Sequence, residues 1–178
     1  DLGEYRYGLT VVGDGEPIVC FHGFSESSYT WDSINLPGYR LIRIDLIGHG
    51  DSDIPEAGEA YTIPKMIEDL HTVIYHMVGD RYYLMGYSMG ARIALSYALQ
   101  HDSEIQGIIL ESGSVGIASD AERAERRKAD EELAHHIEHN DGAWFASRWA
   151  EAPIFESQKQ LLPAVTELIY LRRSHNSP

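Results

Sequence analysis

The segment Gly86-Tyr87-Ser88-Met89-Gly90 fits the pattern G-x-S-x-G, which in a chain with 16 glycines occurs by accident about one time in ten. Its context makes it specific, because an apolar run over residues 82–85 precedes it and a helix-forming run over 91–95 follows. At such a turn the backbone is strained and the serine hydroxyl projects above the sheet. The pattern therefore predicts that Ser88 is the nucleophile of a serine-type active site.

A second loop, His22-Gly23-Phe24, closes a predicted strand at the place where an oxyanion would need backbone donors. We expect the backbone N–H groups of Phe24 and Met89 to form that oxyanion hole. His22 follows an apolar strand and precedes a glycine, so we expect it to brace the loop by a hydrogen bond. We also expect the loop over residues 45–53 to have a structural role, and we assign no proton transfer to its His49.

Strand and helix patterns alternate along the first two thirds of the chain. β-Branched and aromatic runs predict strands, and apolar spacings of three and four predict helices at residues 62–78 and from 91 to about 101. The strands are expected over residues 4–12, 17–21, 39–46, 82–87 and 105–110. Such alternation favours an α/β fold with a mostly parallel sheet flanked by helices. We divide the chain into a core of residues 1–118 and a helical cap of residues 119–178, in which no strand pattern appears.

The composition excludes several kinds of partner. The formal net charge of −14 would repel nucleic acid and anionic lipid, so neither nucleic acid nor a membrane is expected as a partner. No apolar run approaches the ~18 residues of a membrane span, and the first residues lack the pattern of a signal peptide. The single cysteine, Cys20, lies in an apolar run and can form no internal disulfide. These features favour the cytoplasm.

Together the three core segments resemble the α/β-hydrolase superfamily, and further segments resemble its 2-succinyl-6-hydroxy-2,4-cyclohexadiene-1-carboxylate synthase family. The specific segments are Gly86–Arg92, Glu111–Gly116, Ala121–Asp130, Trp149 with Pro153–Phe155, and Leu171–Asn176. The resemblance implies a carbon–oxygen lyase of menaquinone biosynthesis that needs no cofactor or metal. A triad base would remove a proton from 2-succinyl-5-enolpyruvyl-6-hydroxy-3-cyclohexene-1-carboxylate, and pyruvate would be expelled.

Two arginines have positions that suit carboxylate binding. At 100° per residue, Arg126 lies at the centre of the stripe formed by Ala129, Leu133 and Ile137, so its side chain should face inward and need an anion. Arg92 lies one helical turn after Ser88 and can reach back toward it. For every arginine the alternative is an ordinary salt bridge.

The resemblance implies that Arg92, Arg126 and Arg173 bind carboxylates of a small anionic substrate. Tyr87 and Trp149 could pack on that substrate, although aromatic residues at such places as often belong to the core.

The sequence departs from the superfamily pattern in one respect. A triad runs in the order Ser, Asp or Glu, His, with the last two on loops after later strands, and those strands, the acid and the histidine are not found here. Our preferred interpretation is that a further C-terminal segment supplies them. The alternatives are a carboxylesterase or C–C hydrolase with an acyl-Ser88 intermediate, an inactive truncated hydrolase that acts as a binding module, and two copies that complete each other's sheets.

Overall fold

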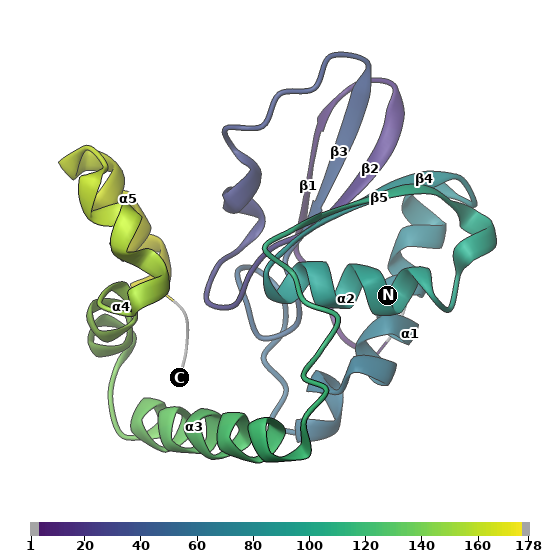
Figure 1. Cartoon of the computed structure of the whole chain (residues 1–178). Helices are drawn as coiled ribbons and strands as arrows, with labels where there is room; N and C mark the ends of the chain where they lie inside the picture. Colours follow the sequence, from purple (N-terminus) through teal and green to yellow (C-terminus); the bar gives the residue numbers. More distant parts are fainter. Residues whose placement is uncertain (1–3, 176–178) are drawn as a thin grey trace. The chain divides into compact units, whose positions relative to one another are not determined.

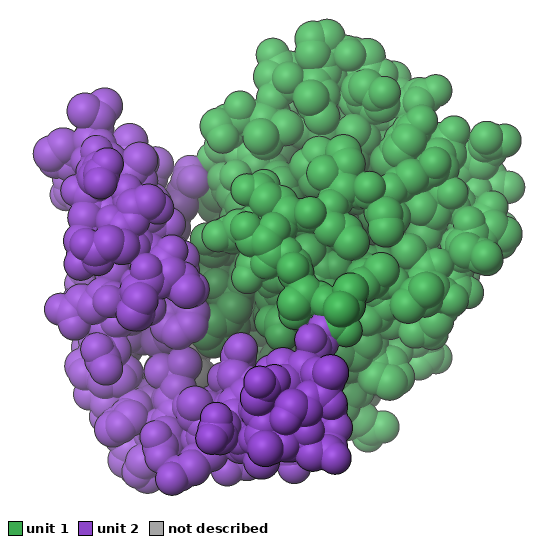
Figure 2. Space-filling model, viewed as in Figure 1, with its two compact units in different colours: residues 1–115 green, residues 116–178 purple. Residues whose placement is uncertain are grey.

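The computed structural model describes residues 4–175. The chain divides into two compact units, residues 1–115 and residues 116–178, which Figure 2 shows in different colours. Figure 1 gives the labels of the helices and strands.

Unit 1 contains a five-stranded sheet with the strand order β1-β3-β2-β4-β5 (Figure 1). The first strand is antiparallel to β3 and all other pairs are parallel, so the predicted mostly parallel sheet is confirmed. The strands are β1 (Leu9–Gly13), β2 (Glu16–Phe21), β3 (Tyr39–Ile44), β4 (Tyr82–Tyr87) and β5 (Ile105–Glu111). Every strand expected from the sequence is present.

The first strand is shorter than predicted, because residues 4–8 pair with a loop. Arg6 exchanges backbone and side-chain hydrogen bonds with Asp53, and the N–H of Gly8 donates to the hydroxyl of Ser52 at 2.9 Å. The carbonyl of Gly8 accepts from the N–H of Asp45, at the end of β3. These contacts satisfy the backbone without a strand partner, and they hold the loop after β3 in place.

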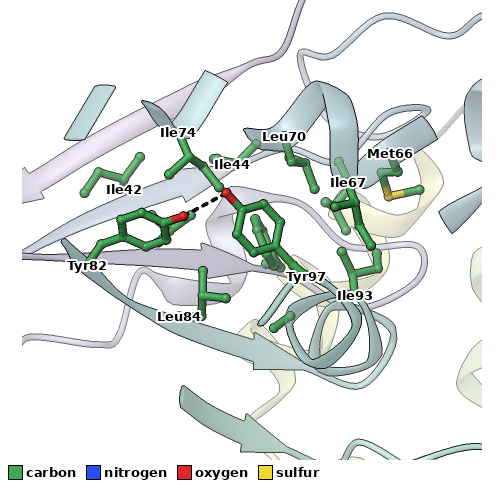
Figure 3. Packing of buried hydrophobic residues seen from close by; sticks show 14 of the residues in the cluster. Ile42, Ile44, Met66, Ile67, Leu70, Ile74, Tyr82, Leu84, Ile93 and Tyr97 are labelled. Atoms are coloured by element: carbon green, nitrogen blue, oxygen red, sulfur yellow. Dashed lines mark hydrogen bonds between the residues drawn. The ribbon is translucent and has the colours of Figure 1, made fainter. Parts of the chain in front are cut away.

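The main core lies between one face of the sheet and the helices α1 (Ile63–Val78) and α2 (Met89–Ala98). Fully buried Leu70 and Ile74 of α1 meet Ile93 of α2 over the strand residues Ile44 and Leu84, as Figure 3 shows. Both helices follow the apolar spacing expected from the sequence. Short 3-10 helices occupy connections: η1 (Ser28–Trp31), η2 (Gly58–Tyr61) and η3 (Asp102–Glu104).

The opposite face carries a smaller cluster in which Trp31 covers Ile18, Cys20, Leu41 and Met85. Cys20 is fully buried, and burial raises the pKa of its thiol to about 12. A thiol in this state is a packing residue with little nucleophilic character.

Strand β5 lies at the edge of the described sheet. Its residues Ile108, Ile109 and Leu110 are 41%, 49% and 39% exposed. Since successive side chains point to opposite faces of a strand, β5 has partly exposed apolar side chains on both faces in unit 1.

In its described residues unit 2 consists of helices and their connections, where the sequence predicts a helical cap over residues 119–178. It contains α3 (Asp120–Glu138), α4 (Gly142–Ala150), η4 (Pro153–Gln160) and α5 (Pro163–Ser174), and α4 packs against α5. The unit's buried residues are Phe145, Ala146, Phe155 and Arg173, whereas α3 buries none. Across residues 4–175, no helix is both long enough and apolar enough to span a membrane.

Candidate active site

Ser88 sits at the sharp turn between β4 and α2, with φ of 54° and ψ of −110°. This positive φ is rare for a residue with a side chain and stores backbone strain. The turn is held against the end of β5, because the N–H of Ser88 donates to the carbonyl of Glu111 at 2.9 Å. The serine is half-buried, as a reactive hydroxyl at a substrate-facing turn must be.

The glycines of the motif allow the helix to approach the strands. A Cβ atom at Gly86 would lie 2.6 Å from the Cα of Ala91, and one at Gly90 would overlap the carbonyl oxygen of Phe21. Such distances are well inside van der Waals contact. The G-x-S-x-G spacing is therefore required by packing between β2, β4 and α2.

The loop after β2 lies directly beside Ser88. A Cβ atom at Gly23 would be 3.5 Å from the Cβ of Ser88 and 3.0 Å from the ring of Tyr87. Phe24 follows in the same loop, and Met89 is the first residue of α2, where a backbone N–H has no carbonyl in a preceding turn to bind. The placement of both residues suits an oxyanion hole, and that role stays a prediction.

His22 braces this loop, as the sequence indicated. Its ring is fully buried, Nε2 accepts a hydrogen bond from the N–H of Leu46 at 2.9 Å, and Nδ1 lies 2.8 Å from the carbonyl of Gly23. Accepting at Nε2 requires the tautomer that donates from Nδ1. Burial, together with neighbouring His49, lowers the pKa of His22 to about 3, although the bond to Gly23 acts to raise it. The imidazole is therefore neutral, and both of its nitrogens are occupied.

His49 has a similar structural role. Its Nε2 accepts from the N–H of Ser25 at 3.3 Å, its Nδ1 lies 3.0 Å from the carbonyl of Ile47, and its ring contacts that of Phe24. Burial is the main cause of its lowered pKa. Our expectation that His49 is architectural agrees with these contacts.

One organising residue was missed in the sequence. The buried carboxylate of Asp45 accepts from the N–H groups of Ser28 at 2.5 Å and Asp51 at 3.0 Å, so it joins the loops after β2 and β3. Gly50, with φ of 54°, lies against this carboxylate, because a Cβ atom at position 50 would overlap the Cγ of Asp45. An aspartate at a strand end followed by a glycine-rich loop was the available signal.

The hydroxyl of Ser88 makes no hydrogen bond to a histidine within residues 4–175, and no strand follows β5 there. Arg92 begins one turn after the serine, since its N–H donates to the Ser88 carbonyl at 3.3 Å. Its side chain is exposed and forms no ion pair within the described residues. A carboxylate-binding role for Arg92 stays a prediction.

The expectation that Arg126 faces inward is wrong within the described chain. The side chain is 55% exposed, and its Nε lies 2.8 Å from both carboxylate oxygens of Asp130. Because α3 buries no residue, the apolar stripe does not create a buried face, and the i, i+4 acid supplies the partner. The salt-bridge alternative describes Arg126 here, and its carboxylate binding is untested.

Trp149 and Arg173 belong to the core of unit 2. Trp149 stacks on Phe145 with 5.6 Å between ring centroids and meets Phe155 edge-on at 5.8 Å. Arg173 is 2% exposed, and its guanidinium carbon lies 4.4 Å from the centre of the Phe155 ring. The cation is thus held on an aromatic face. The segment Leu171–Asn176 ends outside the described residues, at Asn176.

Comparison with known proteins identifies the family of this chain. A family model described as alpha/beta hydrolase fold matches residues 16–166. A protein of Bacillus subtilis (strain 168) is 34% identical over 97% of this chain, and it carries the name 2-succinyl-6-hydroxy-2,4-cyclohexadiene-1-carboxylate synthase provisionally. The chain spans 64% of the length of that relative.

Solved structures agree on the fold. The chain is similar to MenH from S. aureus, with a TM-score of 0.85 and 31% identity over 98% of this chain and 66% of that one. An esterase from Thermogutta terrifontis matches with a TM-score of 0.78 and 23% identity, over 98% of this chain and 63% of that one, which supports the fold alone.

Proposed function

This chain belongs to the alpha/beta hydrolase fold family, and from that premise we propose that it forms part of a 2-succinyl-6-hydroxy-2,4-cyclohexadiene-1-carboxylate synthase. The proposal depends on one geometric observation, the strained Ser88 beside the Gly23 loop. It is supported by the named relatives, which are matched along nearly the whole chain.

The chemistry follows from the names of the two compounds. The substrate is a 3-ene with an enolpyruvyl group at ring carbon 5, and the product is a 2,4-diene. A base therefore takes the proton from carbon 2, the electron pair shifts through the ring, and the carbon–oxygen bond at carbon 5 breaks. The leaving enolate of pyruvate then takes up a proton.

The site offers two groups for this elimination. Carbon 2 lies next to the succinyl ketone, so proton removal places negative charge on the ketone oxygen. The N–H groups of Phe24 and Met89 would stabilise that charge. The hydroxyl of Ser88 would relay the proton, together with a histidine from outside residues 4–175.

The substrate carries carboxylates, and Arg92, Arg126 and Arg173 are the side chains that we propose to bind them. The support is chemical, since a guanidinium fork matches a carboxylate at two points. We propose Tyr87 and Trp149 as apolar contacts for the ring. No cofactor is needed, because the elimination is redox-neutral and is driven by acid–base steps.

The experiment uses protein expressed from the complete gene. Pyruvate release from the cyclohexene substrate is followed by coupled oxidation of NADH with lactate dehydrogenase. We expect turnover that falls by on the order of 10³ in Ser88→Ala. The matched control is Ser96→Ala, on the same helix, which should leave turnover unchanged.

A second candidate is a carboxylesterase or C–C hydrolase. It is favoured by the same strained serine, whose half-buried hydroxyl is suited to form an acyl-enzyme. Release of acid from p-nitrophenyl acetate with an adduct mass on Ser88, and no pyruvate release, would support it. An inactive binding module would show neither reaction.

We also propose that a further strand pairs with β5. Support comes from the exposed Ile108, Ile109 and Leu110 at the edge of the sheet, and from the greater length of the relatives. We favour a segment of the same polypeptide that follows residue 178. Intact mass and gel filtration test this, because a longer monomer supports it and a 178-residue chain contradicts it. A dimer of 178-residue chains would instead indicate exchange between two copies.

The cytoplasm is the location that we propose for this activity. The buried single thiol and the strongly acidic composition support it. Fractionation of the native cells, followed by detection of the protein in the supernatant or the membrane pellet, is the test.

A further inference from the structure

Unit 1 holds a cluster of histidine and glutamate side chains that the proposed reaction does not use. His71 comes from α1, His101 follows α2, and Glu104 lies in η3 before β5. The cluster lies at the end of the sheet where β4 begins, whereas Ser88 follows the other end of β4. A strand of six residues separates the two places by about 20 Å. The cluster is therefore distinct from the elbow.

The two histidine side chains converge on one carboxylate oxygen of Glu104. Oε1 of Glu104 lies 3.0 Å from Nε2 of His71 and 3.8 Å from Nδ1 of His101. The three ligand atoms lie within 4.8 Å of one another, and the side chains are 21–31% exposed. Tetrahedral ligands about 2.0–2.2 Å from a zinc ion lie roughly 3.3 Å apart, so the observed separations are close to those that zinc requires.

The glutamate is held in place by buried tyrosines. Its other oxygen, Oε2, accepts a hydrogen bond from the hydroxyl of Tyr82 at 3.0 Å, and this hydroxyl lies 2.8 Å from that of Tyr97. Figure 3 shows the hydrogen bond between the two tyrosines within the core. Partners of this kind fix the orientation of a metal-binding carboxylate.

The two imidazoles are already packed together. Their rings stack with 4.0 Å between centroids and 10° between planes, which turns one nitrogen of each toward Glu104. Parallel rings must open slightly before both lone pairs can meet at one ion. Their partial exposure leaves room for that rotation.

We propose that His71, His101 and Glu104 bind a divalent transition metal ion, with Zn²⁺ as the best match to two imidazoles and one carboxylate. A fourth position would be filled by water. The ion would join α1 to the connection between α2 and β5, and so stabilise this end of the sheet. The site does not depend on the proposed lyase activity.

A competing group lies at the end of α3, where His135, Glu138 and the capping residue His139 are all exposed. Its ligands come from a single helix and lack buried partners. This exposed group must be removed before zinc binding by His71, His101 and Glu104 is measured. The double variant His135→Ala/His139→Ala therefore serves as the background protein.

The test is calorimetric titration of the metal-free background protein with zinc chloride, with thermal unfolding measured in parallel. We expect one Zn²⁺ per chain and a higher unfolding temperature with zinc. His71→Ala and His101→Ala should each weaken binding at least 10-fold. The matched control His76→Ala alters an exposed histidine of α1 that contacts the Thr72 carbonyl, and it should bind normally.

A milder variant distinguishes weaker zinc binding from loss of the fold. Tyr82→Phe retains the ring but removes the hydroxyl that holds Glu104, and it should weaken zinc binding about 10-fold or more with the circular dichroism spectrum unchanged. The proposal is overturned if the background protein binds no zinc, or if folded His71→Ala and His101→Ala bind it as tightly as the background. Neither result would affect pyruvate release.

Discussion

The imidazole Nε2 of His22 accepts a hydrogen bond of 2.9 Å from the backbone N–H of Leu46. This bond joins the loop after β2, which lies beside Ser88, to the loop after β3. Asp45, the neighbour of Leu46, ties the same two loops through its carboxylate. The backbone around the elbow is therefore positioned by buried polar groups, and the bond from Leu46 requires an unprotonated Nε2 on His22.

Acidification should weaken this arrangement. The pKa of His22 is about 3 in the folded chain and 6.5 in a model peptide, so the unfolded chain binds the proton more readily. The stability from neutral His22 is fully present above pH 6.5 and is lost as the pH falls toward 3. At pH 5 the loss relative to pH 7 is about 2 kcal/mol.

Urea unfolding at pH 7 and pH 5 measures this loss. In His22→Gln, whose amide oxygen can still accept from Leu46, the loss between the two pH values should shrink by most of that amount. His49 faces His22 and has a lowered pKa as well, so His49→Gln is measured beside it. Equal losses in the parent protein and in His22→Gln would show that His22 does not carry the effect.

Gly90→Ala should disrupt the elbow. The added methyl group would overlap the carbonyl oxygens of Phe21 and His22, so β2 and α2 would have to separate. We expect a loss of about 3 kcal/mol or more in the free energy of unfolding. Gly58→Ala is the control, because its methyl group would meet no atom within 4 Å, and its unfolding should change by less than about 0.5 kcal/mol. Similar values for the two variants would contradict this packing account.

Arg126→Ala tests the carboxylate-binding proposal. If Arg126 leaves Asp130 to bind substrate, its removal should lower kcat/KM for pyruvate release about 10-fold to 100-fold. Lys128→Ala, which alters an exposed cation of the same helix paired with Glu132, should have no effect. Unchanged kcat/KM in Arg126→Ala would remove Arg126 from the site.

Local patterns predicted the elements well, because strand and helix periodicities reflect the burial of one face. The bounds of β4 were predicted without error, since the motif glycines mark its end. The prediction for Arg126 failed because periodicity places a residue on a stripe but does not say whether anything covers that stripe. Asp130, one turn away, offered a simpler partner.

The polar clusters were harder to predict. Asp45 organises loops by accepting from backbone N–H groups, which every residue except proline offers, so its only signal in the sequence was its place between a strand end and a glycine-rich loop. His71 precedes Glu104 by 33 residues, and it meets His101 and Glu104 only through the packing of α1 and α2 on the sheet. Residues 4–175 contain no acid or histidine paired with the Ser88 hydroxyl, so that pair stays a proposal.

The central claim is that Ser88 serves proton transfer in an elimination. Its most direct test incubates protein from the complete gene with 2-succinyl-5-enolpyruvyl-6-hydroxy-3-cyclohexene-1-carboxylate, while pyruvate and the intact protein mass are followed together. We predict pyruvate release that requires Ser88, with no mass added to the protein during turnover. An acyl adduct on Ser88, or turnover that survives Ser88→Ala, would contradict the account.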